Sequence, residues 1–209
     1  AYMVEASHRA GLRIHAWMNP LRLRSTQTPA ALSADNVASV WRSDDDPAND
    51  HWAVETSGGL FLNPAYPEVR AYLAQAVSEL VSRYAVDGVH LDDYFYPTTD
   101  ASFDAAEYES YCASAESPLE LGEWRKAQIN AMVQELYTAI HAANPDVVMG
   151  IAPQGNISND ERIGADVAMW GSTAGYVDYL CPQLYYPFDS PSQPFVQTAE
   201  RWRALVTCP

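Results

Sequence analysis

The chain has 209 residues and a net charge of -15, from 27 acidic and 12 basic side chains, and nearly half of its residues are hydrophobic. This acidic balance repels a phosphate backbone, so nucleic acid is excluded as an expected partner. The chain lacks an apolar run of the roughly 20 residues that cross a bilayer, so we expect no membrane span in it. Its length suits one domain with a sizeable core.

The first ten residues are typical of the end of a helix that Gly11 closes, since glycine is favoured just past a helix terminus. They lack the basic region followed by an apolar region that marks a signal peptide, so we expect none in this chain. The pattern instead indicates a chain that begins inside a larger protein.

Residues 12–20 follow as a predicted strand that ends in an Asn-Pro pair. Side chains two apart share a face of a strand, which places His15, Trp17 and Asn19 together. Arg22 lies just beyond this strand.

Residues 25–59 have an irregular pattern, and we expect a long loop there. A loop of this length in a compact domain is usually functional or disordered. Its acidic cluster matches no calcium-binding loop in its spacing, so we interpret it as a solvated charge run. The cluster consists of Asp44, Asp45, Asp46 and Asp50.

Residues 87–97, DGVHLDDYFYP, are predicted to form the central strand, after a helix over residues 68–84. Alternation places His90 and Asp92 on one face and the apolar residues between them on the other. In a closed parallel barrel, the apolar face suits the helix layer, and the other face lines the interior. An ionised carboxylate in such an interior is costly unless it is paired or used. Asp92 is therefore the first candidate for chemistry.

The rest of the chain continues the alternation of helices and strands. Its expected parts are a polar insertion at 98–120 with some helical periodicity, a helix at 121–143, a strand at 146–153, an irregular helical segment at 160–173, a strand at 177–187 and a helix at 196–205. Three cysteines form neither a metal-binding spacing nor an even disulfide set. Of these, Cys181 falls in an apolar strand pattern and is expected to be a buried thiol.

This alternation predicts a parallel sheet with helical crossovers. Each predicted strand ends in polar residues and a proline, and the carboxyl face is where (β/α)8 barrels carry their active sites. The glycine-rich phosphate loop that often marks a doubly wound sheet is missing. We therefore predict an α/β fold of the (β/α)8 TIM-barrel type. Residues 1–209 would form a single, partial catalytic domain that covers about the middle four βα units.

Half a barrel would expose an apolar interior and two sheet edges, and such edges invite pairing with another strand. We therefore expect the remaining barrel strands of a larger chain, or a second copy of this chain, to cover them.

Five blocks in order resemble the glycosyl hydrolase-like 10 family: HAWMNPLR, DGVHLDDYFYP, EWRKAQIN, GIAPQGN and YVDYLCPQLYYP. They cover nearly the whole chain, and the second and last are specific. The resemblance implies a TIM barrel of the bacterial cell envelope, outside the cytoplasm, regarded as a glycosidase; some members act on peptidoglycan glycan strands. By position, it implies the third to sixth barrel strands. One departure is the sequence Ile157, Ser158 and Asn159 after GIAPQGN, where the family usually has an aromatic residue and an arginine.

Hydrolysis of a glycosidic bond normally uses two carboxyl groups. Asp92 is the candidate nucleophile or charge stabiliser. Asp93 would point away in a regular strand, yet it could turn into the cleft at the strand end. No predicted strand ends in a glutamate, so the general acid stays open between Glu55, Asp178 and Asp189 or a strand outside this chain.

Candidate substrate-binding residues are aromatic, amide, imidazole or guanidinium side chains near the predicted strand ends. Aromatic faces stack on sugar rings, and Arg22 would suit the lactyl carboxylate of a muramic acid unit. His90 could tune Asp92 or be a satisfied interior histidine. Arg125 is expected to form a structural ion pair at the barrel rim. The full set of candidates is His15, Trp17, Asn19, Arg22, Asn63, His90, Tyr94, Tyr96, Gln154, Asn156, Gln183 and Tyr185.

The leading hypothesis is a cofactor-free glycoside hydrolase acting on bacterial envelope polysaccharide, with peptidoglycan glycan strands as a candidate substrate. The alternative is a non-catalytic carbohydrate-binding barrel that kept the cleft and lost the acid. A metal-dependent hydrolase using His90 and Asp92 is disfavoured because the 5 histidines are scattered. We therefore expect neither a metal nor a cofactor.

Overall fold

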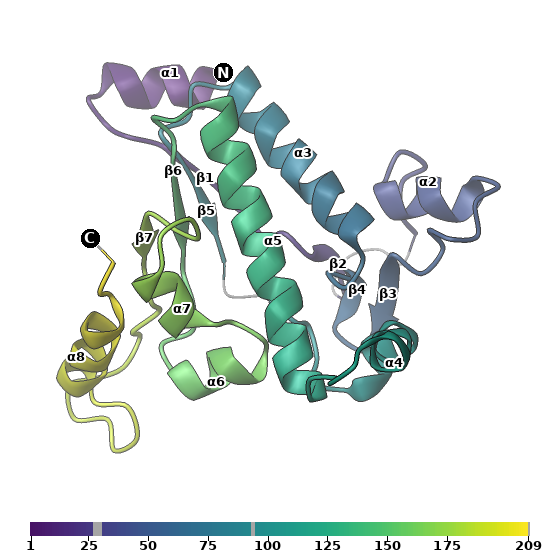
Figure 1. The fold of residues 1–209 in the computed structure, drawn as a ribbon. Helices are drawn as coiled ribbons and strands as arrows, with labels where there is room; N and C mark the ends of the chain where they lie inside the picture. The colour runs from purple at the N-terminus through teal and green to yellow at the C-terminus, as the bar shows by residue number, and fades with distance from the viewer. Residues whose placement is uncertain (27–30, 93–94, 209) are drawn as a thin grey trace.

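The computed structural model describes residues 1–26, 31–92 and 95–208. At its centre is a four-stranded parallel sheet in the order β1-β5-β6-β7 (Figure 1). The strands are β1 (His15–Met18), β5 (Gly88–Leu91), β6 (Val148–Ile151) and β7 (Tyr179–Leu180). Because the strands are parallel, all four end at the same side of the molecule, which we call the carboxyl end of the sheet.

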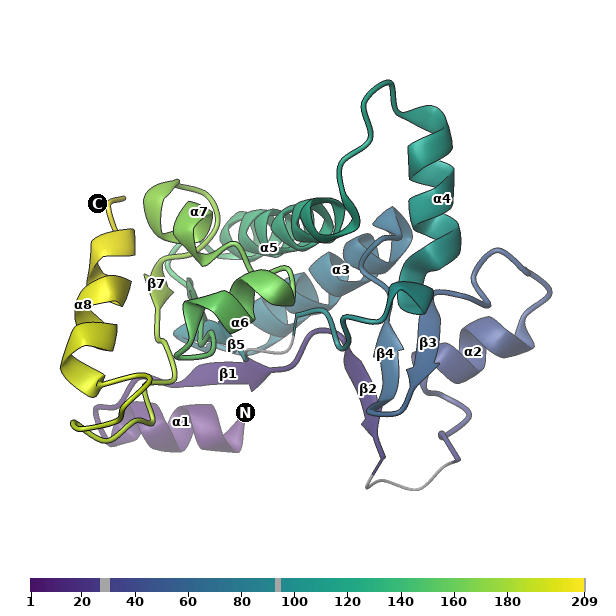
Figure 2. The same ribbon diagram turned by 90° about the horizontal axis from the view of Figure 1, so that it is seen from below.

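Helices α3 (Pro67–Arg83) and α5 (Leu121–Ala143) lie side by side on one face of this sheet (Figures 1 and 2). Both match the predicted helices to within about one residue at each end. α3 buries Val69, Leu73, Val77 and Val81, one residue per turn. These side chains join the same core as the helix-facing residues of β5 and β6, which are Val89, Leu91, Met149 and Ile151.

Four further helices surround the sheet: α1 (Tyr2–Arg9), α6 (Ile157–Arg162), α7 (Val167–Ser172) and α8 (Phe195–Leu205). Gly11 follows α1 with a φ of +72°, the left-handed conformation for which glycine was predicted. Trp202 of α8 is buried and donates its indole N–H to the Gly155 carbonyl oxygen at 3.0 Å, which fixes α8 to the loop after β6. In the described part of the chain, no helix is long and apolar enough to cross a membrane.

Residues 25–59 do not form the predicted irregular loop. They contain α2 (Val37–Ser43), β3 (Ala53–Thr56) and the first residue of β4 (Gly59–Leu62). With β2 (Arg22–Ser25), these strands form an antiparallel sheet in the order β2-β4-β3. β2 and β4 are far apart in the sequence, so local periodicity gave no sign of their pairing.

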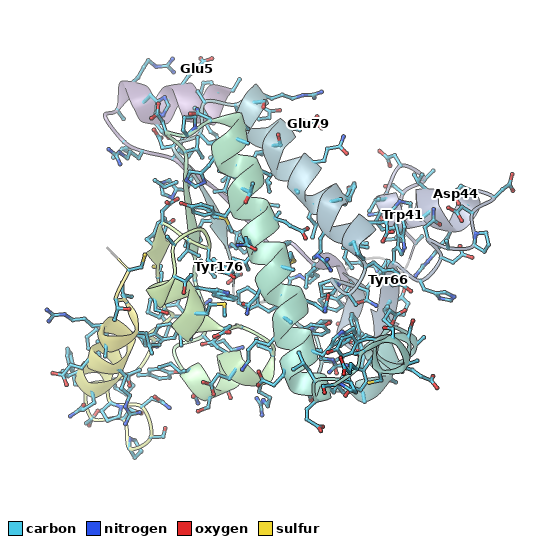
Figure 3. All side chains as sticks on the ribbon, viewed as in Figure 1. Glu5, Trp41, Asp44, Tyr66, Glu79 and Tyr176 are labelled. Atoms are coloured by element: carbon cyan, nitrogen blue, oxygen red, sulfur yellow. The ribbon has the colours of Figure 1, made fainter. Side chains whose placement is uncertain are left out.

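An aromatic cluster joins α2 to the start of α3. The rings of Trp41 and Trp52 pack edge to face with centroids 5.0 Å apart, and Tyr66 lies 6.4 Å from Trp52. Figure 3 labels Trp41 and Tyr66 in this region. The Tyr66 hydroxyl also donates to the Glu107 carboxylate. This hydrogen bond ties the start of α3 to the predicted insertion, which contains η1 (Ala101–Asp104) and α4 (Ala105–Ser114).

A buried ion pair connects η1 to α5. Arg125 and Asp104 are 6% and 1% exposed, and Arg125 Nε donates to Asp104 Oδ2 at 2.9 Å. The guanidinium also donates to the Asp100 carbonyl oxygen at 2.7 Å. It lies over the Tyr96 ring, 4.9 Å from the centroid. The structural ion pair predicted for Arg125 is confirmed, and it fixes the segment after β5 against α5.

Two glycines leave room for rings inside the curved sheet. A Cβ added to Gly150 on β6 would lie 2.0 Å from a ring carbon of Tyr179, and one added to Gly88 on β5 would lie 2.7 Å from the ring of His15. Any larger residue would overlap these rings. The interior face of β5 and β6 is therefore filled by side chains that reach over from β7 and β1.

β7 is much shorter than the strand predicted over residues 177–187. Only Tyr179–Leu180 pairs as a strand, followed by an isolated bridge between Gln154 and Gln183. Pro182 lies between them and offers no N–H for a continuous ladder. Cys181 is exposed rather than buried, contrary to the prediction.

Replacing Arg125 with methionine is expected to lower the free energy of unfolding by about 3–5 kcal/mol, because the buried Asp104 carboxylate would lose its counter-ion. Lys126→Met is the matched control at the next position. Lys126 forms an ion pair with the exposed Glu123, so its loss should change the free energy by less than about 1 kcal/mol. Urea denaturation of both variants provides the test. Equal losses would contradict the role assigned to the buried pair.

Two Gly→Ala substitutions should change stability in opposite directions. Gly150→Ala is expected to destabilise the chain by about 1–3 kcal/mol through overlap with the Tyr179 ring. Gly122 lies in the first turn of α5, where a Cβ meets nothing within 4 Å, so Gly122→Ala should stabilise by about 0.4–1 kcal/mol. Denaturation midpoints measure both. A neutral Gly150→Ala would show that the interior is not closely packed there.

Candidate active site

Asp92 directly follows β5 and lies half-buried at the carboxyl end of the sheet. Its backbone N–H donates to the Met18 carbonyl oxygen at 3.2 Å, and its Oδ1 accepts from Gln183 Nε2 at 3.0 Å. The same Gln183 nitrogen donates to the Ala152 carbonyl oxygen at 3.1 Å. The ends of β1, β5 and β6 and the segment after β7 therefore meet at this carboxylate. That is the position at which parallel barrels carry catalytic groups.

Gln154 is placed beside Gln183 by the isolated parallel bridge between the two residues. Its backbone N–H donates to Asp160 Oδ1 at 2.9 Å, and Asp160 is fully buried. A buried carboxylate thus supports the loop after β6 from beneath. Sequence reasoning did not identify Asp160, which lies at the first position of a segment expected only to be helical.

A cluster of three rings lies on the interior face next to Asp92. The Nδ1 atoms of His15 and His90 each lie 2.8 Å from the Tyr179 hydroxyl oxygen. The rings of Tyr179 and His90 are stacked, with centroids 5.8 Å apart and an interplanar angle of 22°. Tyr179 was not among the predicted site residues. The available signal was Gly150 within a strand pattern, since such a glycine often marks a close approach by another group.

Burial shifts the pKa values of two members of this cluster, His90 and Tyr179. It lowers the pKa of the His90 imidazole, and the nearby His15 lowers it further, while the Asp92 carboxylate acts in the opposite direction. Burial also raises the pKa of the Tyr179 phenol, followed by the effects of Cys181 and Asp178. At neutral pH, His90 is therefore uncharged and Tyr179 keeps its proton.

Two predicted sugar-stacking residues are strongly exposed. Trp17 is 60% exposed and pairs in register with His90 across β1 and β5. Tyr185 is 84% exposed and lies two residues after Gln183. Their ring faces are accessible at the carboxyl end of the sheet, where a glycan could stack on them.

Asn19 and Asn156 act mainly on their own loops. Asn19 Oδ1 accepts from the backbone N–H of Arg22 at 3.1 Å, so it shapes the turn that places Arg22 at the start of β2. Asn156 Oδ1 accepts from the backbone N–H of Ser158 at 3.1 Å and caps α6. Asn156 also lines a small pocket, whose polar side chains include Ser158, Gln193, Thr198 and Arg201.

Asn63 and Tyr96 are buried, which corrects their predicted role in sugar binding. Asn63 is 1% exposed, and its Oδ1 accepts from the backbone N–H of Ala65 at 3.0 Å. Tyr96 is 3% exposed under the Arg125 guanidinium. Neither ring nor amide can reach a ligand from these positions. Asp93 and Tyr94 lie outside the described residues.

The three carboxylates considered as the general acid occupy different places. Both Glu55 oxygens accept from Arg24 Nη2, at 2.8 and 2.7 Å, in the antiparallel sheet. Asp178 precedes β7 at the amino end, where its Oδ2 accepts from the Met149 backbone N–H at 2.6 Å. Asp189 is exposed, in the segment between β7 and α8 that extends past the carboxyl end (Figure 1).

Within residues 1–26, 31–92 and 95–208, no group of three or more His, Cys, Asp or Glu side chains could hold a metal ion. The Nδ1 atoms of His15 and His90 are directed to the Tyr179 hydroxyl instead. The interpretation as a metal-dependent hydrolase using His90 and Asp92 thus finds no ligand set in this part of the chain.

The model of the glycosyl hydrolase-like 10 family matches residues 1–209. Glycosyl hydrolase YngK of Bacillus subtilis (strain 168) is 30% identical over 223 residues, which cover 97% of this chain and 41% of that protein. Glycosyl hydrolase DigH of Escherichia coli (strain K12) is 31% identical over 229 residues, which cover 98% of this chain and 50% of that protein. The chain thus spans half or less of the length of these curated relatives.

Two solved structures share the fold. The glycoside hydrolase domain of PgaB (BpsB) from Bordetella bronchiseptica superposes with a TM-score of 0.54 at 12% identity, over 93% of this chain and 59% of that one. The alpha-galactosidase from Lactobacillus brevis superposes with a TM-score of 0.51 at 14% identity. The match covers 98% of this chain and 23% of that one. With the parallel sheet, these likenesses confirm the predicted α/β fold of TIM-barrel type, of which the described strands form part. The family model matches residues 1–209, and both curated relatives are named glycosyl hydrolases. The chain therefore belongs to the glycosyl hydrolase-like 10 family.

Proposed function

We propose that this chain carries the catalytic carboxylate of a glycoside hydrolase that acts on bacterial envelope polysaccharide. The observation that carries the proposal is the position of Asp92, at the end of β5 with an amide donor from Gln183 and a neutral imidazole on the same face. Family membership and the names of the relatives support glycosidic hydrolysis. Peptidoglycan glycan strands, outside the cytoplasm, are our first candidate substrate, supported by the resemblance of the sequence blocks to envelope proteins.

Asp92 would act as the nucleophile or as the anion that stabilises the transition state. Glycosidic cleavage passes through an oxocarbenium-like state with developing positive charge, and a fixed carboxylate lowers its energy. Gln183 holds that carboxylate by donating to Oδ1 while also donating to the Ala152 carbonyl oxygen. An uncharged His90 places no competing cation beside the reacting sugar.

Asp189 would serve as the general acid, which protonates the leaving oxygen. Of the three carboxylates considered, Glu55 is bound by Arg24 and Asp178 supports the amino end of the sheet. Asp189 instead lies in an exposed segment beyond the carboxyl end, where a proton donor is needed.

Trp17 and Tyr185 would bind the glycan by stacking, and Arg22 would bind a sugar carboxylate. The free sides of β1 and β7 would be covered by further barrel strands or by a second copy of this chain. This arrangement fits a chain that spans half or less of its relatives.

Asp92→Asn is expected to reduce the release of reducing ends from peptide-free glycan strands by at least roughly a hundredfold, because the transition state loses its anion. Mass spectrometry of the products measures this. The control is Asp146→Asn, an exposed aspartate at the amino end, which should cut normally. Normal cutting by Asp92→Asn would make Asp92 structural. A wild-type protein that binds glycan without cutting would instead be a carbohydrate-binding barrel.

Asp189→Asn should separate the roles of the two carboxylates. A nitrophenol leaving group departs without a proton, so the variant should lose far more activity on glycan strands than on nitrophenyl glycosides. Asp92→Asn should lose activity on both substrates. Initial rates on the two substrate types provide the ratio. If Asp189→Asn loses the same activity on both substrates, or loses none on either, Asp189 is not the acid. The acid would then come from a strand outside this chain.

A further inference from the structure

The Tyr179 hydroxyl is shared by two imidazoles, and its single proton restricts their states. His15 Nδ1 and His90 Nδ1 both lie 2.8 Å from the hydroxyl oxygen. A phenol donates one hydrogen bond and can accept two. Both Nδ1 atoms therefore cannot accept from it. At least one of the two histidines must carry its proton on Nδ1 and donate to the hydroxyl oxygen.

The Tyr179 hydroxyl and the two Nδ1 atoms all form hydrogen bonds only if the two histidines have different tautomers. One imidazole accepts the Tyr179 proton at Nδ1 and carries its own proton on Nε2. The other donates from Nδ1. If both donated, the hydroxyl proton would be left without a partner in a part-buried interior, which is unfavourable. Because the hydrogen bond made by one ring nitrogen determines the state of the other, Tyr179 imposes opposite tautomers on His15 and His90.

The surroundings indicate which histidine is which. His90 shares its face of β5 with Asp92, which lies two residues further along the chain. On the same interior face, His15 approaches from β1 and Tyr179 approaches from β7. β6 contributes only Gly150 at this level. A carboxylate only accepts hydrogen bonds, so the N–H side of His90 is favoured toward Asp92. That side is Nε2, since Nδ1 is engaged by Tyr179. Among the described residues, His90 Nε2 has no hydrogen-bond partner, which leaves it available to a ligand.

We propose that Tyr179 is a positioning residue that holds His90 in the Nε2–H tautomer, so that this N–H donates to a hydroxyl oxygen of the sugar bound at Asp92. The opposite tautomers follow from the two contacts with the Tyr179 hydroxyl. The assignment of Nε2–H to His90 follows from the position of Asp92, and the sugar contact rests on the function proposed above. His15 is the Nδ1–H donor that completes the arrangement. The glycine at position 150 is part of it, because it gives the Tyr179 ring its place.

The first test is the wild-type protein without glycan at pH 7.5. Two-bond ¹H–¹⁵N correlation spectra distinguish Nδ1–H from Nε2–H imidazoles, and His15→Gln and His90→Gln variants assign the signals. We expect His90 as Nε2–H and His15 as Nδ1–H. The same tautomer for both, or Nδ1–H for His90, would overturn the proposal. This measurement needs no Tyr179 variant to fold.

The second test is Tyr179→Phe, which keeps the ring and removes the hydroxyl. Both imidazoles should shift to mixed tautomers, and kcat on glycan should fall about tenfold, the equivalent of one well-placed hydrogen bond. Tyr137→Phe is the control: it removes a hydroxyl that donates to Asp178 at the amino end and should leave the tautomers and kcat unchanged. Tyr179→Phe with wild-type tautomers and kcat would contradict the proposal.

Failure of this inference and failure of the proposed function give different results. If no glycan is cut but the histidines show opposite tautomers, the glycosidase proposal fails and the positioning by Tyr179 stands. If glycan is cut while the two histidines share one tautomer, only the present inference fails.

Discussion

The packing on the interior face of this sheet depends on two glycines, Gly88 and Gly150, which leave space for rings from neighbouring strands. Barrel interiors are usually filled by branched aliphatic residues, but a Cβ at Gly150 would lie 2.0 Å from the Tyr179 ring. Rings from β7 and β1 therefore lie over β6 and β5. These rings carry polar atoms, which need hydrogen-bond partners within the interior. The Tyr179 hydroxyl provides them by forming hydrogen bonds with the imidazoles of His15 and His90. A steric constraint thus produces a polar layer next to Asp92.

The carboxylate above that layer is fixed from several directions. β5 sends apolar side chains into the helix layer, and these anchor the strand itself. Gln183 holds the Asp92 carboxylate, and the ion pair between Arg125 and Asp104 fixes the segment that follows. Sites built on regular elements with such supporting contacts keep their geometry better than sites on loops.

Local signals made part of this structure predictable. α3 and α5 were predicted closely because their periodicity and their terminal prolines act within a few residues. Asp92 was singled out by its place at a strand end, but its contact with Gln183 depends on pairing across β6. Tyr179 was missed for the same reason: its two partners come from other strands. Tyr96 was expected to bind a ligand because it ends an aromatic run. Its burial depends on groups that are not adjacent to it in the sequence, the Arg125 guanidinium and the Phe103 ring.

The position of Asp104 has a consequence for barrel engineering. It belongs to the polar stretch after the central strand, yet its carboxylate is inside the protein against Arg125. The stretch therefore leaves the barrel wall only after η1, where α4 projects away from the sheet (Figure 2). A loop graft meant to change substrate choice should retain both residues as a unit and place its junctions within 105–119.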